Sequence, residues 1–219
     1  MAGRPRGVED EVILRAAAEV MGRVGPSGLT LAAVAREVGL VPGTLVQRFG
    51  SKRGLVLALA DQSVRDTDAL SDRFRGEQGS ALGALAALLA QWMAPMVSPE
   101  TFANHLAFLC TDLTDPELHE RALAVHRAQR RAVGALLAEA VSTGELRATT
   151  DVEALTATVQ AVTSGAGLIW ALDREGALVE RVRHGLDAVL APHVATPTDA
   201  ATAATTSTAR IRRKTGRKR

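Results

Sequence analysis

Residues 30–49 contain two short helical patterns separated by a turn of only a few residues. The apolar positions of both follow helical spacing: Leu31, Val34, Ala35, Val38, Leu40, Leu45 and Phe49. Thr30 is typical of a helix N-cap, and Gly39 is typical of the left-handed residue that ends a helix. Pro42 suits the first turn of the next helix, where no backbone N–H is needed. The segment therefore predicts a helix-turn-helix, in which the buried apolar set fixes how the two helices cross.

The chain on either side of this segment also has a helical pattern, and no run alternates with a period of two over the length of a strand. Glycine and proline fall between the apolar-periodic segments, where they would end helices. The expected helices span 8–24, 30–38, 42–49, a segment beginning after Ser51, 80–97, 100–110, 116–142, 152–172 and 177–191. These patterns predict an all-α fold.

Cysteine content and charge restrict the function further. Cys110 is the only cysteine, which excludes an internal disulfide, a multi-cysteine zinc site and an iron–sulfur cluster. We expect it to be a small buried side chain. The net charge of +2 divides unevenly, with +3 on residues 1–60, −7 on 61–194 and +6 on 195–219. The two ends are therefore the parts expected to meet a polyanion.

The second helix of the motif has one face that the apolar residues of the motif leave free. This face carries Pro42, Gly43, Thr44, Gln47 and Arg48. A helix of this size fits the major groove of DNA, where glutamine and arginine can hydrogen-bond base edges.

Residues 8–61 resemble the tetracycline-repressor (TetR) family of bacterial regulators. The resemblance is carried by Ile13, Leu14, Ala16, Ala17, Gly25, Thr30, Val34, Ala35, Gly39, Gly43, Thr44, Leu45, Phe49, Ser51 and Lys52. It implies an N-terminal three-helix DNA-binding domain at 8–61, with the motif at 30–49. A helical ligand-binding and dimerisation domain at 62–194 is expected to follow. Residues 1–7 would be an N-terminal arm, and 195–219 a disordered basic tail.

The resemblance also assigns roles to single residues. Thr30, Thr44 and Lys52 would contact phosphates, Gly43 would let the backbone approach DNA, and Gln47 would face the groove. The family usually has Ser or Thr at position 41 and Tyr at position 46, where this chain has Val41 and Val46. Loss of those two contacts would weaken DNA binding by about 1–3 kcal/mol in total if nothing replaced them.

Four arginines are candidates for further DNA contacts. Arg48 and the arm residues Arg4 and Arg6 could replace the lost contacts, since arginines on an extended segment suit a narrow minor groove. The alternative for the arm is a solvated terminus. Arg36 is either a phosphate contact or a solvent-facing charge. The basic tail would either add salt-dependent DNA affinity or keep the chain soluble.

In the second domain, the helices at 152–172 and 177–191 match the position of the family's dimer interface, with ordinary core helices as the alternative. The 154–172 stretch has no charge, but its Thr, Ser and Gln residues argue against a membrane span. Candidate ligand-binding residues, each of which could instead be plain core, are Trp92, Met93, Met96, Phe102, His105, Phe108, Gln160, Thr163 and Trp170. His119 and His126 lie two helical turns apart, too far to share one metal ion.

The expected function is that of a cytoplasmic, nucleoid-associated, sequence-specific transcriptional regulator. It would bind a palindromic double-stranded DNA operator as a homodimer, repress transcription, and release the operator when a small-molecule effector binds. No catalytic residues, metal, cofactor or membrane are expected, and the chain is not expected to be an enzyme. Two alternatives stay open: an architectural DNA-binding protein without a ligand, and a helical enzyme, which a reactive, accessible Cys110 would favour.

Overall fold

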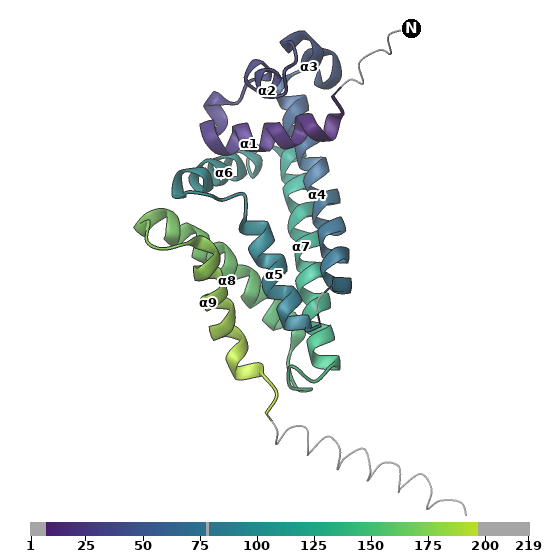
Figure 1. The fold of residues 1–219 in the computed structure, drawn as a ribbon, viewed down its shortest axis with the longest axis vertical. Coiled ribbons are helices and arrows are strands. Elements are labelled where there is room, and N and C mark those ends of the chain that lie inside the picture. Colours follow the sequence, from purple (N-terminus) through teal and green to yellow (C-terminus); the bar gives the residue numbers. More distant parts are fainter. Residues whose placement is uncertain (1–7, 78, 197–219) are drawn as a thin grey trace, which may run out of the picture.

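The fold is known from a computed structural model that describes residues 8–77 and 79–196 (Figure 1). Within these residues the chain forms nine α-helices and one 3₁₀ helix. They are α1 (Asp10–Gly28), α2 (Leu31–Glu37), α3 (Pro42–Phe49), α4 (Lys52–Glu77), α5 (Ala81–Met93), α6 (Pro99–Asp112), α7 (Pro116–Ser142), α8 (Val152–Asp173), α9 (Leu178–Leu190) and η1 (Ala191–His193). The all-α prediction is confirmed: the described part of the chain holds no strand, only an isolated bridge between Leu146 and Val194.

Capping residues, glycine and proline determine where several helices begin and end. The Thr30 hydroxyl accepts a hydrogen bond from the Ala33 N–H at 3.0 Å, and Gly39 is left-handed with φ of 67°. α5 ends at Met93, short of the expected residue 97, because Pro95 lacks the N–H that a continuing helix needs.

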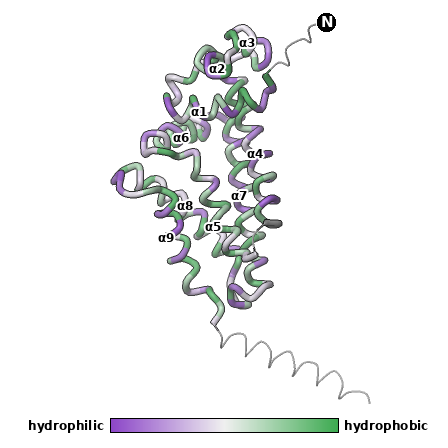
Figure 2. The backbone as a smooth tube through the Cα atoms, viewed as in Figure 1, coloured by the Kyte–Doolittle hydropathy of each residue, from purple (hydrophilic) through white to green (hydrophobic). Residues whose placement is uncertain are grey.

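Hydrophobic and hydrophilic positions are interspersed along the helices (Figure 2). The buried apolar side chains of the described residues form two clusters. The head cluster joins α1–α3 to the first turns of α4, and its buried members are Ile13, Leu14, Ala17, Val20, Leu29, Val34, Ala35, Leu45, Leu55 and Phe108. The body cluster joins the far end of α4 to α5, α7, α8 and α9. Phe108 belongs to α6, so the head cluster is completed by a helix from the body.

One helix, α4, belongs to both clusters. Leu55 near its start is buried in the head cluster, and Phe74 near its end is buried in the body cluster. The expected domain boundary at 61/62 therefore falls inside a continuous helix. Figure 1 shows α4 running down from the head beside α7.

By length and composition alone, α8 is the one described helix that could cross a membrane. Leu155, Val159 and Trp170 on this helix are nevertheless buried in the body cluster. Gly167 lies so close to α6 that an added Cβ would come within 2.2 Å of the Phe102 ring. α8 is thus packed as a core helix on this side.

Candidate nucleic-acid interface and cavity

The outer face of α3 is open to solvent in the described structure. Val41 and Val46 are 69% and 49% exposed, and Pro42, Gly43 and Gln47 are exposed beside them. A Cβ built on Gly43 would meet nothing within 4 Å, so the fold itself does not require glycine there. The α3 face is therefore free to meet another molecule.

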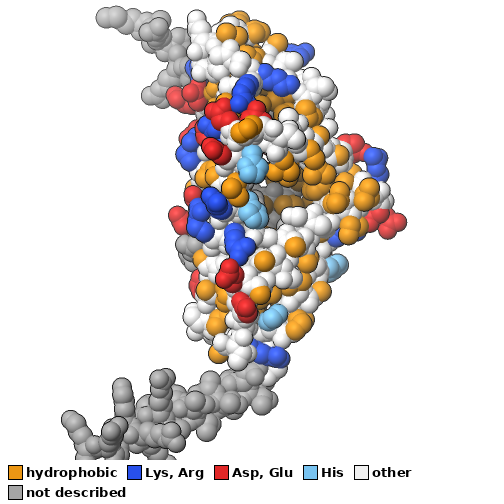
Figure 3. All heavy atoms as spheres, turned by 180° about the vertical axis from the view of Figure 1, so that it is seen from behind, with side chains coloured by type: hydrophobic (Ala, Val, Ile, Leu, Met, Phe, Trp, Pro, Cys, Tyr) orange, Lys and Arg blue, Asp and Glu red, His pale blue; other side chains and the backbone are white. Residues whose placement is uncertain are grey.

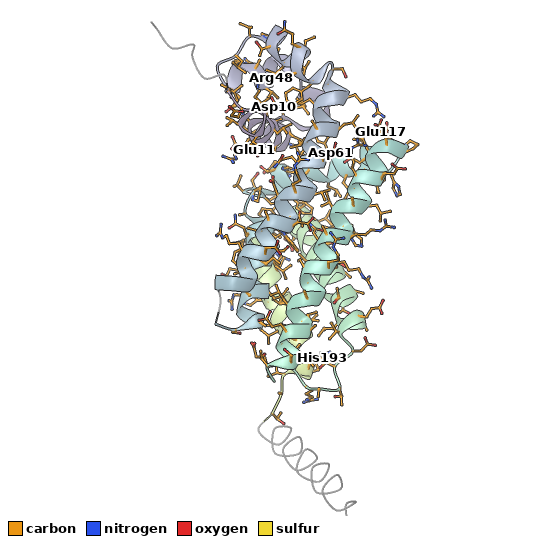
Figure 4. The ribbon with its side chains drawn as sticks, turned by 90° about the vertical axis from the view of Figure 1, so that its right-hand side faces the viewer. Asp10, Glu11, Arg48, Asp61, Glu117 and His193 are labelled. Carbon is orange, nitrogen blue, oxygen red and sulfur yellow. The ribbon has the colours of Figure 1, made fainter. Side chains whose placement is uncertain are left out.

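The polar residues around this face divide into engaged and free side chains. Arg48 Nη1 donates to the Val8 carbonyl and, at 2.8 Å, to Asp10 Oδ1, which ties α3 to the start of α1 (Figure 4). Lys52 Nζ donates to the Pro26 carbonyl. Among described residues, the side chains of Gln47 and Arg36 have no hydrogen-bond partner, and Thr44 is half-buried. Arg4 and Arg6, like the tail from residue 197, lie outside the described residues.

A cavity of about 460 Å³ opens between α5, α6, α7 and α8. Its lining is mainly apolar, and it contains no Asp, Glu, Lys or Arg. The lining residues are Leu89, Trp92, Met93, Met96, Phe102, His105, Leu106, Leu109, His126, Gln129, Val133, Gln160, Thr163, Ser164, Gly165 and Leu168. We call it the body cavity.

A second cavity of about 590 Å³ lies nearer the head, and we call it the head-side cavity. It is lined from α1, α4, α6 and α7, by Met21, Val56, Leu59, Ala60, Ser63, His105, Phe108, Leu109, Asp112, Leu113, His119, Ala122, Leu123, Val125, His126, Gln129 and, from α8, Ser164. The two cavities share His105, Leu109, His126, Gln129 and Ser164, so they meet at these side chains. Figure 3, which views the molecule from behind relative to Figure 1, shows a hollow in the middle of the surface, bordered by hydrophobic and histidine side chains.

Most of the residues expected to bind a ligand do line these cavities. Trp92, Met93, Met96, Phe102, His105, Gln160 and Thr163 line the body cavity, and Phe108 lines the head-side cavity. Trp170 does not line either: it is buried in the body cluster, and its Nε1 donates to the Gly176 carbonyl at 3.0 Å. Trp170 thus has the place that the core alternative expected, because an aromatic side chain fits a packed core as well as a cavity wall.

α7 contributes cavity residues that were not predicted from the sequence. His126, Gln129 and Val133 have i, i+3, i+7 spacing and face the cavities together. This spacing is visible in the sequence, but it is equally typical of a helix face packed in a core. Among described residues no group of three His, Cys, Asp or Glu is placed to hold a metal ion.

Three polar groups at the cavities are electrostatically unusual. Burial lowers the pKa of His105, which favours the neutral imidazole. Burial and the neighbouring Asp115 raise the pKa of the Asp112 carboxyl. Asp112 Oδ1 and Trp92 Nε1 are buried and have no hydrogen-bond partner in the described structure. Such atoms are costly to leave unpaired, so a partner from outside the chain would stabilise them.

Polar contacts join the head to the body beside the head-side cavity. Arg53, at the start of α4, pairs with Asp115 at 2.9 Å and with Glu117 at 2.7 Å, where α7 begins. Arg121 on α7 pairs with Asp61 on α4 at 2.8 Å, and Figure 4 shows Asp61 and Glu117 just below the head. The turn between α6 and α7 is therefore held directly to the helix that follows α3.

A second connection joins α6 to α1. The side-chain amide of Asn104 donates to the Gly22 carbonyl at 2.8 Å. Gly22 also lies against His105, since an added Cβ would come within 2.9 Å of His105 Nε2. α6 therefore touches both a cavity and the first helix of the head.

The outer side of α8 is apolar and exposed. Leu168, Ile169 and Leu172 are 48%, 53% and 76% exposed, and Val179 at the start of α9 is also exposed. Cys110, expected to be buried, is instead exposed because it lies on the outer side of α6.

Comparison with known proteins shows what kind of protein carries this head and body. Residues 13–59 match the family described as bacterial regulatory proteins of the tetR family, and residues 80–186 match the tetracyclin repressor-like C-terminal domain. The fold and both matches define a helix-turn-helix transcriptional regulator with a helical second domain. The chain belongs to the tetR family of bacterial regulatory proteins.

Solved structures share the fold at low sequence identity. A transcriptional regulator from Saccharomonospora viridis in complex with choline has a TM-score of 0.70 and 16% identity, covering 85% of this chain and 97% of that one. FadR from Bacillus subtilis in complex with stearoyl-CoA has a TM-score of 0.61 and 18% identity, covering 83% and 97%. SmeT, the repressor of the Stenotrophomonas maltophilia efflux pump SmeDEF, has a TM-score of 0.63 and 19% identity, covering 87% and 93%. No curated protein matches the sequence.

Proposed function

We propose that the chain is a cytoplasmic repressor that binds a palindromic operator as a homodimer and releases it when a small molecule fills the two cavities. The observation that carries this proposal is the lining of the head-side cavity. Side chains of α1 and α4, which also build the head, form its wall together with α6 and α7. An occupant there would act directly on the elements that hold α3.

The α3 face supports major-groove binding. Gly43 leaves room for close approach of a DNA backbone, and Gln47 has an unengaged amide that can reach a base edge. Val41 and Val46 offer exposed methyl groups, which suit contact with the C5-methyl of thymine. Thr30, Thr44 and Lys52 border this face as candidates for phosphate contacts, with Arg36 on α2.

Two side chains would gain a second role in the complex. Arg48 and Lys52 have surface positions, so their hydrogen bonds to Asp10 and to the Pro26 carbonyl can be exchanged for phosphate at low cost. The arm residues Arg4 and Arg6 remain candidates for the minor groove, outside the described residues.

The apolar outer side of α8 supports the homodimer. Leu168, Ile169 and Leu172 expose more apolar surface than solvent favours, and Val179 extends the patch onto α9. Pairing this patch with its copy would give an isologous interface and two α3 helices for two half-sites. Centre-to-centre spacing of about 34–36 Å, or near a multiple of it, is expected for such half-sites.

Release requires the effector to bind the DNA-free conformation more tightly than the DNA-bound one. The route that the contacts support runs from the head-side cavity to the α6–α7 turn, then through Arg53 to the start of α4. Since α4 follows α3 directly, movement of its first turn changes the distance between the two α3 helices of a dimer.

The test is selection of genomic fragments by the purified full chain at about 150 mM salt, followed by footprinting. A protected inverted repeat, bound by two chains, is the expected result. Binding without sequence preference would overturn the repressor and favour the architectural protein. Gln47→Ala is the matched variant: it should reduce affinity for the repeat by roughly tenfold, whereas Gln91→Ala on α5 should leave it unchanged.

A further inference from the structure

The charge distribution in the two cavities says what kind of molecule they suit. Among their lining residues Asp112 is the only Asp, Glu, Lys or Arg. The rest is apolar apart from a few histidine, glutamine, serine and threonine side chains. A carboxylate or phosphate entering this space would find no lysine or arginine in the lining to pair with it.

Asp112 is placed to receive a positive charge. It ends α6 at the wall of the head-side cavity, and its Oδ1 is buried without a partner in the described structure. His105, His119 and His126 line the same cavity, but none of them forms a hydrogen bond to this oxygen. A carboxylate with one oxygen buried and unpartnered is stabilised by a cation with N–H donors.

We propose that the effector is an elongated, mainly apolar amine whose ammonium group pairs with Asp112, while its apolar part extends past His105 into the body cavity. This inference rests on the proposed function for the role of the site, but its chemistry can be tested without DNA. Trp92 Nε1, buried and unpartnered at the body cavity, suits an acceptor atom at the other end of the molecule.

The position of Asp112 explains how such a ligand would be sensed. Asp112 is three residues before Asp115, whose carboxylate caps α7 and pairs with Arg53. An ammonium group bound to Asp112 would act on the α6–α7 turn, which is the turn that Arg53 connects to the start of α4. A ligand confined to the body cavity would not reach this turn.

The experiment compares three probes of equal length: decylamine, decanol and decanoate, each below its critical micelle concentration. Calorimetric titration of the full chain without DNA is expected to give a Kd for decylamine about tenfold lower than for decanol, with decanoate weakest. Asp112→Asn should raise the Kd of decylamine to that of decanol and leave decanol unchanged. Glu120→Gln, which removes an exposed carboxylate of α7 outside both linings, should change nothing.

Three results would overturn the proposal: equal affinity for decylamine and decanol in the unaltered chain, a preference for the amine that survives Asp112→Asn, or no binding of any probe. Carbon-13 NMR of labelled aspartate gives a reading that needs no variant, because decylamine should lower the pKa of the Asp112 carboxyl and decanol should not. Operator release is measured separately. An Asp112-dependent preference without release would keep this inference and contradict the effector role in the proposed function.

Discussion

Gly43 is expected to matter for DNA binding and not for folding. It lies in the first turn of α3 with open space where a Cβ would be, and its φ is not in the left-handed region. Neither packing nor backbone conformation therefore requires a glycine. We therefore predict that a substitution here changes DNA affinity without lowering the stability of the fold.

Gly43→Ala should therefore weaken DNA binding without loss of stability. The added methyl is expected to stabilise α3 by up to about 1 kcal/mol, because alanine is the better helix former. It would occupy the space between the helix and DNA and lower operator affinity by about tenfold or more. Thermal melting and fluorescence anisotropy measure the two effects. Gly83→Ala on α5, also without a close contact, is the control, and an unchanged affinity for Gly43→Ala would contradict the assignment.

His105 makes the stability depend on pH in a definite direction. Burial lowers its pKa in the folded chain, so the unfolded chain binds more protons as pH falls below about 6.5. Its contribution is thus present above that pH and is lost as pH falls toward the folded pKa. The charged groups that share a cavity with His105 are Asp112 in the head-side cavity and Arg15, Glu19 and Arg23 in a third cavity, which His105 also lines.

His105→Gln should make the free energy of unfolding fall less steeply between pH 7.5 and 5.5. Urea denaturation at both pH values gives the comparison. His193→Gln, at the opposite end of the molecule from the head (Figure 4), should keep the slope of the unaltered chain. An unchanged slope in His105→Gln would show that His105 is not the group responsible.

At the scale of elements, α5 shows how a distant residue can define the start of a helix. Ser80 caps it locally, since its hydroxyl accepts from the Gly83 N–H at 3.1 Å. Glu145, from the turn after α7, adds a carboxylate that accepts from the Ala81 N–H at 2.8 Å and from the Ser80 hydroxyl. The negative charge also lies at the positive end of the helix dipole.

Glu145→Ala is expected to lower the free energy of unfolding by roughly 1–2 kcal/mol, because three donors at the start of α5, the Ser80 hydroxyl and the Ala81 and Leu82 N–H groups, lose this acceptor. Chemical denaturation measures this. Glu139→Ala, an exposed glutamate of α7, should cost less than about 0.5 kcal/mol. Equal losses in the two variants would argue against the cap.

Helices whose ends are encoded locally could be predicted from the sequence. Thr30, Gly39 and Pro42 place α2 and α3 with the bounds that the structure gives, and Asp115 does the same for α7. Glu145 and Arg53 could not be predicted, because each acts on groups more than 60 residues away. The cavity lining was predicted only in part, since the same apolar residues serve equally in a core, as Trp170 does.

For the whole molecule, the ion pairs of Arg53 link the first turn of α4 directly to the start of α7. They are partly exposed, so they contribute little to stability. Their importance would lie in how effector binding is transmitted. A change at Arg53 should therefore alter the coupling between effector binding and operator binding, and not the affinity for either one.

Arg53→Ala should leave operator affinity and effector affinity within about twofold, yet reduce by about tenfold the change in operator affinity that the effector causes. Anisotropy titrations with and without effector measure that ratio. Arg131→Ala breaks another pair between α7 and α4, with Asp68, and should keep the coupling. A full effect of the effector in Arg53→Ala would exclude the route through this residue.

The continuity of α4 has a consequence for how the chain can be divided. A linker that a protease could cut is absent between the head and body clusters, since Leu55 and Phe74 lie on one uninterrupted helix. A fragment ending at residue 61 would also lack Phe108, which completes the head cluster from α6. Head and body should therefore melt in a single calorimetric transition, and the DNA-binding part is not a module that can be transplanted by itself.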